Sequence, residues 1–174
     1  MTKKKIIIFL VGFFLCLSGW QSVKSYQQRS IEKSYYNLGY KPVSDAIQDT
    51  ESYYKTNLDL PIKLPPLDFT HSFGRFNQGN ENLEIEYLNE EKHFNYIINV
   101  FPARIGNNLL TRTNHSKIIS LKDGTQAYYS TTGIDKKISS ILMFQKNNWT
   151  YMLSIEESLL DNPVTTLVEI ADSL

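Results

Sequence analysis

Two closely spaced carboxylates are the first side chains of this chain that could carry out chemistry. Glu84 and Glu86 stand two residues apart in an alternating run, which places both on one face of a strand about 7 Å apart. Such a pair can act as acid and base only where burial raises the pKa of one carboxyl group. Because apolar residues alternate with the glutamates, we expect both to lie on a solvated face, which does not favour glycosidase chemistry.

The three histidines have neighbours of the types that catalysis or metal binding uses. His71 is close in sequence to Asp68 and Ser72, but neighbours on one extended strand point to opposite faces and do not form a hydrolase triad. His93 follows two glutamates in a predicted turn, where acidic side chains are normally hydrated, and His115 begins a predicted strand. We therefore expect no catalytic residue, no metal site and no cofactor, and a protein that is not an enzyme.

Composition and charge narrow the class of protein. The chain of 174 residues is 41% hydrophobic and 13% aromatic, enough for one domain with a filled core. Four of the 18 basic residues precede Tyr26, which leaves 14 basic and 18 acidic residues after that point. We do not expect nucleic-acid binding from a mildly acidic domain without a basic stripe. The only cysteine, Cys16, excludes an internal disulfide and fits an extracytoplasmic protein of a Gram-positive bacterium.

The N-terminal residues combine a basic cluster with an apolar run, a pattern typical of segments that enter a membrane. The run is either a cleaved signal peptide or an uncleaved anchor, and the poor cleavage site at residues 23–25 favours the anchor. We expect a single-pass protein of the cell membrane whose C-terminal domain faces outward, or a secreted domain if the segment is cut. The residues that carry this prediction are Lys3, Lys4, Lys5, Ile6, Leu17 and Trp20.

Three regions are predicted along the chain: an anchor or signal peptide at 1–25, a helical stalk at 26–42 and an extracytoplasmic α+β domain at 43–174. In the domain, period-two alternation predicts an antiparallel β-sheet of six or seven strands, packed by an N-terminal and a C-terminal helix. Ser44 is expected to cap the first helix, with Ile47, Tyr53 and Tyr54 on its buried side. Asn162 and Pro163 are expected to open the last helix, and residues 106–114 to be a polar loop.

Several predicted strands are apolar on both faces. This pattern requires either helices on both sides of the sheet or an apolar ligand held against a concave face. The leading hypothesis is a module that senses or binds another protein of the cell envelope, and the alternative is a carrier or sensor of a lipid. The side chains that would form a packing face or hold the apolar ligand are Phe94, Tyr96, Ile98, Trp149, Tyr151 and Leu153.

Four short stretches also carry a resemblance. The pattern Trp149-x-Tyr151-x-Leu153 is followed by a spacer and the run at 167–174. This ending resembles the last strand and helix of the bacterial domain of unknown function 4367 family. Residues 60–65, 83–87 and 124–128 resemble the proline-containing entry and two strands of that family, so the resemblance covers roughly 60–174. It implies an α+β domain outside the cytoplasm, membrane-anchored or lipoprotein-like, and it transfers no catalytic residue.

Overall fold

The computed structural model of the chain describes residues 30–112, 117–134 and 137–174. The chain divides into two compact units, residues 1–39 and 40–174. In the first unit residues 30–37 are helical, where the sequence predicts a stalk. The membrane-anchor residues predicted between Lys3 and Trp20 lie outside the described residues. None of the helices that the structure describes is long and apolar enough to cross a membrane.

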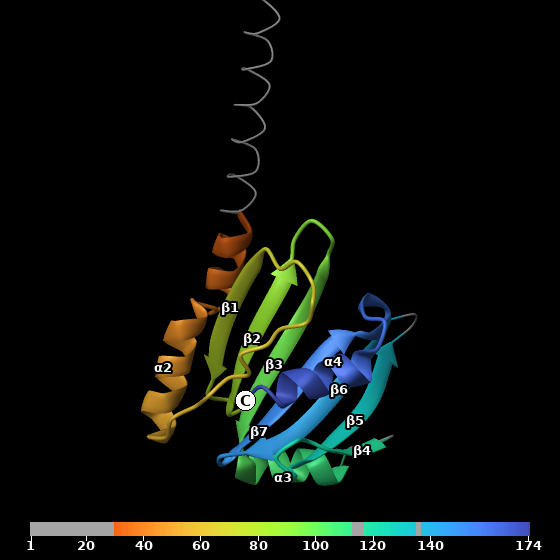
Figure 1. Cartoon of the computed structure of the whole chain (residues 1–174). Helices are drawn as coiled ribbons and strands as arrows, with labels where there is room; N and C mark the ends of the chain where they lie inside the picture. Colours follow the sequence, from red (N-terminus) through yellow and green to blue (C-terminus); the bar gives the residue numbers. More distant parts are fainter. Residues whose placement is uncertain (1–29, 113–116, 135–136) are drawn as a thin grey trace, which may run out of the picture. The chain divides into compact units, whose positions relative to one another are not determined.

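The second unit is built on one antiparallel sheet of seven strands with packed helices, which confirms the predicted α+β class (Figure 1). The strands lie in the order β1-β2-β3-β7-β6-β5-β4, so the last strand of the sequence occupies the middle of the sheet. Two three-stranded meanders thus flank β7. The strands are β1 His71–Asn77, β2 Asn82–Asn89, β3 Phe94–Pro102, β4 Lys117–Ser120, β5 Gln126–Ile134, β6 Lys137–Lys146 and β7 Trp149–Glu156.

The helices of this unit are α2 Val43–Tyr54, α3 Ala103–Arg112 and α4 Pro163–Ala171, with a single 3-10 turn, η1 Glu157–Leu159, before α4. The start of α4 is as predicted: the Asn162 side chain accepts a hydrogen bond from the Thr165 backbone N–H at 3.1 Å, and Pro163 occupies the first turn. The Asn162 cap and Pro163 together fix the residue at which α4 begins and returns toward the sheet.

Alternation along β7 assigns the sheet residues to two faces. Tyr151 and Leu153 point to the face that carries the main core, called the core face below, and Thr150 points to the second face. On the core face α4 packs over β6 and α2 packs beside β1 (Figure 1). Residues 57–69, called the connector below, link α2 to β1 in the sequence and cross this face. Backbone carbonyl groups of the connector accept hydrogen bonds from the side chains of Trp149 and Tyr151 in β7.

Helix α2 makes its closest contact through small residues. Of its predicted buried side, Ile47 and Tyr54 are partly buried against the core, and only Tyr53 is wrong. Ala46 and Thr50 are fully buried, whereas Tyr53 is 51% exposed. The cause is Gly74 in β1, where an added Cβ would lie 2.7 Å from Ala46 Cβ. The helix therefore approaches the strand at backbone distance, and only small side chains fit between them. Ser44 is also wrong as the cap, since α2 begins one residue earlier, at Val43.

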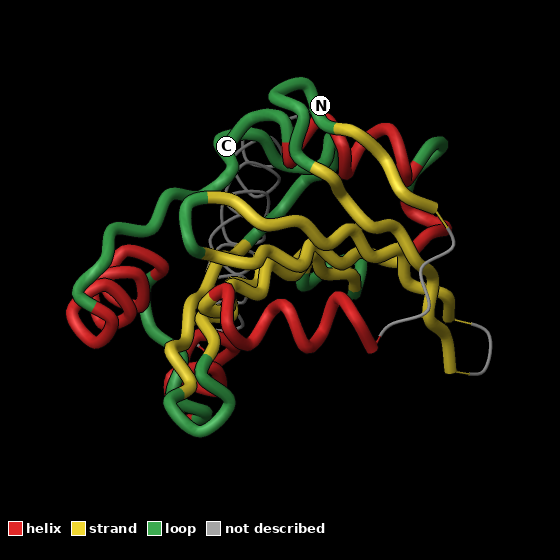
Figure 2. Tube along the Cα trace, turned by 90° about the horizontal axis from the view of Figure 1, so that it is seen from below, coloured by secondary structure: helices red, strands yellow, loops and turns green. Residues whose placement is uncertain are grey.

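Helix α3 occupies part of the segment predicted to be a polar loop, and that prediction is wrong. The helix packs over β7, β3 and β6 (Figure 2). Gly106 lies so close to Thr150 that an added Cβ would be 1.7 Å from Thr150 Oγ1. Because Thr150 belongs to the second face, helices cover both faces of the central strands. The two-sided apolar strands are thus explained by packing on both sides.

Candidate functional site

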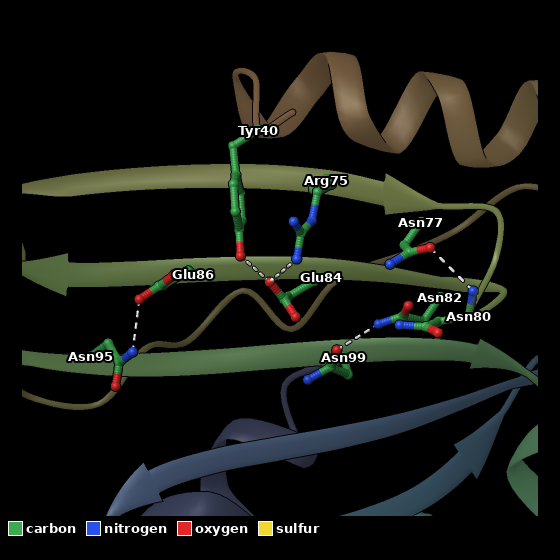
Figure 3. A network of polar contacts seen from close by, with 9 residues as sticks. All are labelled: Tyr40, Arg75, Asn77, Asn80, Asn82, Glu84, Glu86, Asn95 and Asn99. Carbon is green, nitrogen blue, oxygen red and sulfur yellow. Dashed lines mark hydrogen bonds and ion pairs between the residues drawn. The ribbon is translucent and has the colours of Figure 1, made fainter. Parts of the chain in front are cut away.

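Glu84 is held by two side chains on the second face of the sheet (Figure 3). Arg75 lies directly opposite in the register of β1 and β2, with its Nη2 3.3 Å from Glu84 Oε1. The Tyr40 hydroxyl donates a hydrogen bond to the same oxygen, and Arg75 Cζ lies 4.4 Å from the centre of the Tyr40 ring. Burial, followed by the hydrogen bond to Glu84, raises the pKa of Tyr40, so the phenol remains a donor at neutral pH.

Glu86 shares this face with Glu84, as predicted, but it is not solvated. Only 9% of Glu86 is exposed, and its Oε1 accepts a hydrogen bond from Asn95 Nδ2 at 2.7 Å. The prediction of a solvated pair is therefore wrong for Glu86. Strand alternation shows which side chains share a face, but it does not show how deeply that face is covered.

A pair of buried amides extends the polar network to the other end of β2 (Figure 3). Asn82 Nδ2 donates to Asn99 Oδ1 at 2.7 Å, and both residues are at least nine-tenths buried. In the turn between β1 and β2, Asn77 Oδ1 accepts from the Asn80 backbone N–H at 3.1 Å. These contacts join β1, β2 and β3 through side chains, each bond contributing about 0.5–1.5 kcal/mol.

The structure does not bring the residues near His71 together as a catalytic group. His71 Nδ1 lies 2.8 Å from Thr70 Oγ1. Asp68 instead pairs with Lys92, with 3.3 Å between its Oδ2 and the Lys92 Nζ. Ser72, the next residue of β1, points to the opposite face from His71.

His93 is not one of the residues of the polar network (Figure 3). His93 is in the turn between β2 and β3 with a left-handed backbone, φ 55°. His115 lies outside the described residues. In the part of the chain that the structure describes, no group of three or more His, Cys, Asp or Glu side chains could hold a metal ion.

The six side chains predicted as a packing or ligand face lie on the core face. Tyr96, Ile98 and Leu153 are 0% exposed, Tyr151 is 1% and Trp149 is 2% exposed, and Phe94 is half-buried. The connector lies directly on them: Trp149 Nε1 donates to the Asn57 carbonyl and the Tyr151 hydroxyl to the Asp59 carbonyl, each at 2.9 Å. These contacts place them in the packed core.

A hollow of about 320 Å³ lies on the second face between α3 and strands β5 and β6. The sequence does not predict this hollow, because one wall is α3, where the residue pattern predicts a polar loop. Pro102 before the helix and the four-residue spacing of Ile105 and Leu109 were the available signals. The hollow is lined by Asn107, Leu110, Thr125, Gln126, Tyr128 and Gln145.

The two edges of the sheet differ. At the β1 edge, Lys41 forms an isolated bridge to Gly74, with both N–H to C=O distances at 2.9 Å. The N-terminal end of α2 packs beside the same glycine. Chain segments thus cover this edge at its centre.

At the other edge, β4 pairs with β5 alone among the described strands. The Leu121 N–H donates to the Thr125 carbonyl, which fixes the alternation of the β4–β5 ladder. By that alternation the N–H and C=O groups of Ile118 and Ser120 point away from β5, toward the open edge. The Ile118 side chain is 62% exposed beside them.

No family model, no curated protein and no solved structure matches this chain. The resemblance to the domain of unknown function 4367 family stays a prediction from the sequence.

Proposed function

We propose that this chain is a non-enzymatic interaction module of the cell envelope that binds another protein through the β4 edge of its sheet. The observation that supports this most directly is the outward-pointing backbone of Ile118 and Ser120. Unpaired N–H and C=O groups at a sheet edge are a template for an added strand from another chain.

The difference between the two edges supports this choice of surface. The β1 edge is bridged by Lys41 and packed by α2, whereas β4 keeps a large apolar side chain exposed next to its outward backbone groups. An added strand would gain main-chain hydrogen bonds from β4 and apolar contact from Ile118. Because β4 has only four residues, the partner strand is expected to be short.

The packing of the core face favours the interaction function over the lipid carrier. A carrier needs its inner aromatic side chains to face an apolar cavity. Here Trp149 and Tyr151 instead direct their polar atoms into hydrogen bonds with the connector, and Phe144 stacks on Tyr151 with 5.1 Å between ring centres.

The proposed location outside the cytoplasm draws on the N-terminal sequence. A basic cluster at Lys3–Lys5 followed by an apolar run would retain the chain at the membrane with the remainder outside. The partner is accordingly expected among envelope proteins.

Site-specific photocrosslinking in the native cell tests the edge. A photoreactive residue at Ser120 of the full chain is expected to give one adduct of defined mass, and the same residue at exposed Asp161 none. Ile118→Pro should abolish the Ser120 adduct, because proline removes an N–H that points toward the partner and not toward β5.

Ile118→Val is the matched control, since it keeps the N–H and a β-branched side chain and should keep the adduct. The thermal unfolding temperature of both variants shows whether a lost adduct comes from loss of the partner's binding or from unfolding of the domain. Equal adducts at positions 120 and 161, or an adduct that survives Ile118→Pro in a folded domain, would exclude the β4 edge as the binding surface.

A further inference from the structure

The hollow between α3 and β5 is built by close packing that fixes its walls. Gly106 seats α3 directly on Thr150, and the Gln145 side chain links the helix to the sheet beside it. Gln145 Nε2 lies 2.8 Å from Asn107 Oδ1 and 3.0 Å from Thr150 Oγ1. Its two amide protons are used in these bonds, so Oε1 is the atom of this amide that can accept from a ligand.

A second amide presents the opposite polarity. The Tyr128 hydroxyl donates to Gln126 Oε1 at 3.2 Å, which orients both side chains along β5. Gln126 therefore offers its Nε2 protons as donors, while Gln145 offers an acceptor. Tyr128 adds an aromatic ring and Leu110 an apolar side chain to the same lining.

The described part of the lining carries no charge. The six lining residues that the structure describes are neutral, and Asp123 and Lys146, described charged residues close to them in the sequence, pair with each other at 3.0 Å. An anion or a cation would find no opposite charge in the lining to offset the loss of its hydration. The chemistry therefore favours a neutral ligand with several groups that both donate and accept.

Tyr128 lies inside the sheet, with register partners on both sides, Ile118 of β4 and Met143 of β6. Gln126 and Gln145 lie just beyond the end of the β5–β6 pairing, and their register partners are Ser120 of β4 and Thr150 of β7. An extended peptide binds largely through a continuous row of free main-chain groups, which the two-sided pairing at Tyr128 interrupts. A polyhydroxylated ring needs only side-chain partners and an apolar surface for its C–H face.

We propose that this hollow binds a neutral saccharide, with the ring packed on Tyr128 and its hydroxyl groups bonded to Gln126 and Gln145. A volume of about 320 Å³ is at the lower end for ligand pockets, which suits one or two sugar units. The site adjoins the β4 edge, since Tyr128 and Gln126 are the register partners of Ile118 and Ser120. It uses side chains of β5 and β6, whereas the β4 edge would bind through backbone groups, so sugar titration and photocrosslinking at Ser120 test the two proposals separately.

The test is a titration of the full chain in mild detergent with two uncharged probes, N,N′-diacetylchitobiose and maltose. Saturation-transfer NMR detects binding, and calorimetry gives the affinity. Tyr128→Ala and Gln126→Ala should each weaken binding about tenfold, through loss of the ring contact or of one hydrogen bond. Binding of both sugars would indicate recognition of hydroxyl groups, and binding of the first alone an acetamido sugar of an envelope glycan.

Two controls keep the result specific. Thr132→Ala changes an exposed residue on the same strand and face outside the hollow and should leave the affinity unchanged. Tyr128→Phe keeps the ring but removes the hydroxyl that orients Gln126, so it should weaken binding less than Tyr128→Ala does. The proposal is overturned if neither sugar binds, if Thr132→Ala weakens binding as much as Tyr128→Ala in folded protein, or if a blocked trialanine peptide binds better than either sugar.

Discussion

Single side chains in this domain use their polar atoms to position segments that are distant in the sequence. Tyr40 reaches Glu84 on β2, and Tyr151 on β7 donates to the carbonyl of Asp59 in the connector. Burial is the leading cause that raises the pKa of both phenols. Each of these contacts requires the protonated hydroxyl, since a phenolate has no proton to donate.

The domain is therefore expected to lose stability in alkali. A phenol whose pKa is raised in the folded state stabilises the fold fully below pH 10, and this contribution is lost as the pH rises above that value. Each such tyrosine adds a slope of about 1.4 kcal/mol per pH unit there. Urea unfolding at several pH values should show the loss above pH 10, and Tyr151→Phe should make it less steep.

The control for Tyr151→Phe is a core substitution that removes no tyrosine hydroxyl. Leu153→Val on the same strand should lower the stability at every pH and leave the alkaline slope as in the wild type. An equal slope in Tyr151→Phe and the wild type would show that Tyr151 does not titrate with unfolding.

At the level of elements, helix α3 depends on one close contact with the sheet. Gly106, Asn107 and Asn108 are weak helix formers, so local preference alone favours a loop at this position. The helix exists because Gly106 lets it seat on Thr150 and bury the second face of β7. Packing against the sheet therefore outweighs the low helix propensity of these residues.

We predict that Gly106→Ala destabilises the domain. Alanine alone would favour a helix by about 1 kcal/mol, but its Cβ would lie 1.7 Å from Thr150 Oγ1 and force α3 to move. Overpacking of this kind costs about 1–3 kcal/mol, measurable as a lower urea midpoint. Gly79→Ala is the control, because its Cβ would meet only Asn77 Oδ1, at 3.4 Å. A more stable Gly106→Ala variant would contradict this account of α3.

These elements also show what a sequence can reveal. The strands and the start of α4 follow from alternation and from the Asn162-Pro163 pair, which are local signals. The site residues Tyr40 and Arg75 could not be found in this way. The β1–β2 register brings Arg75 to Glu84, and the bridge between Lys41 and Gly74 brings Tyr40 there. The hollow could be predicted only with α3 as its wall. Helix α3 in turn depends on a contact between residues 44 positions apart, Gly106 and Thr150, which no local pattern reveals.

At the level of the whole molecule, the chain combines an N-terminal unit and the sheet domain in one polypeptide. The predicted anchor lies in the first unit and the proposed binding surfaces in the second. Their separation along the chain allows each to be removed without touching the other's residues.

Deletion of residues 1–25 is expected to release the protein from the membrane. The full chain should sediment with membranes and resist alkaline carbonate extraction, since an apolar segment of this length holds a helix in the bilayer. Protease added outside protoplasts should digest the sheet domain. A protected domain, or a full chain that stays in the supernatant, would contradict the proposed location; a folded deletion variant serves as the soluble control.

The central position of β7 has a consequence for how the protein is made. The meanders β1–β3 and β4–β6 form from neighbouring segments, but neither bonds to the other until β7 enters between them. Because β7 follows both meanders in the sequence, each meander keeps an open inner edge until β7 has been synthesised. Pairings of such high sequence separation form slowly. A helper protein that shields open strand edges would therefore have two of them to cover, one on β3 and one on β6, until β7 arrives.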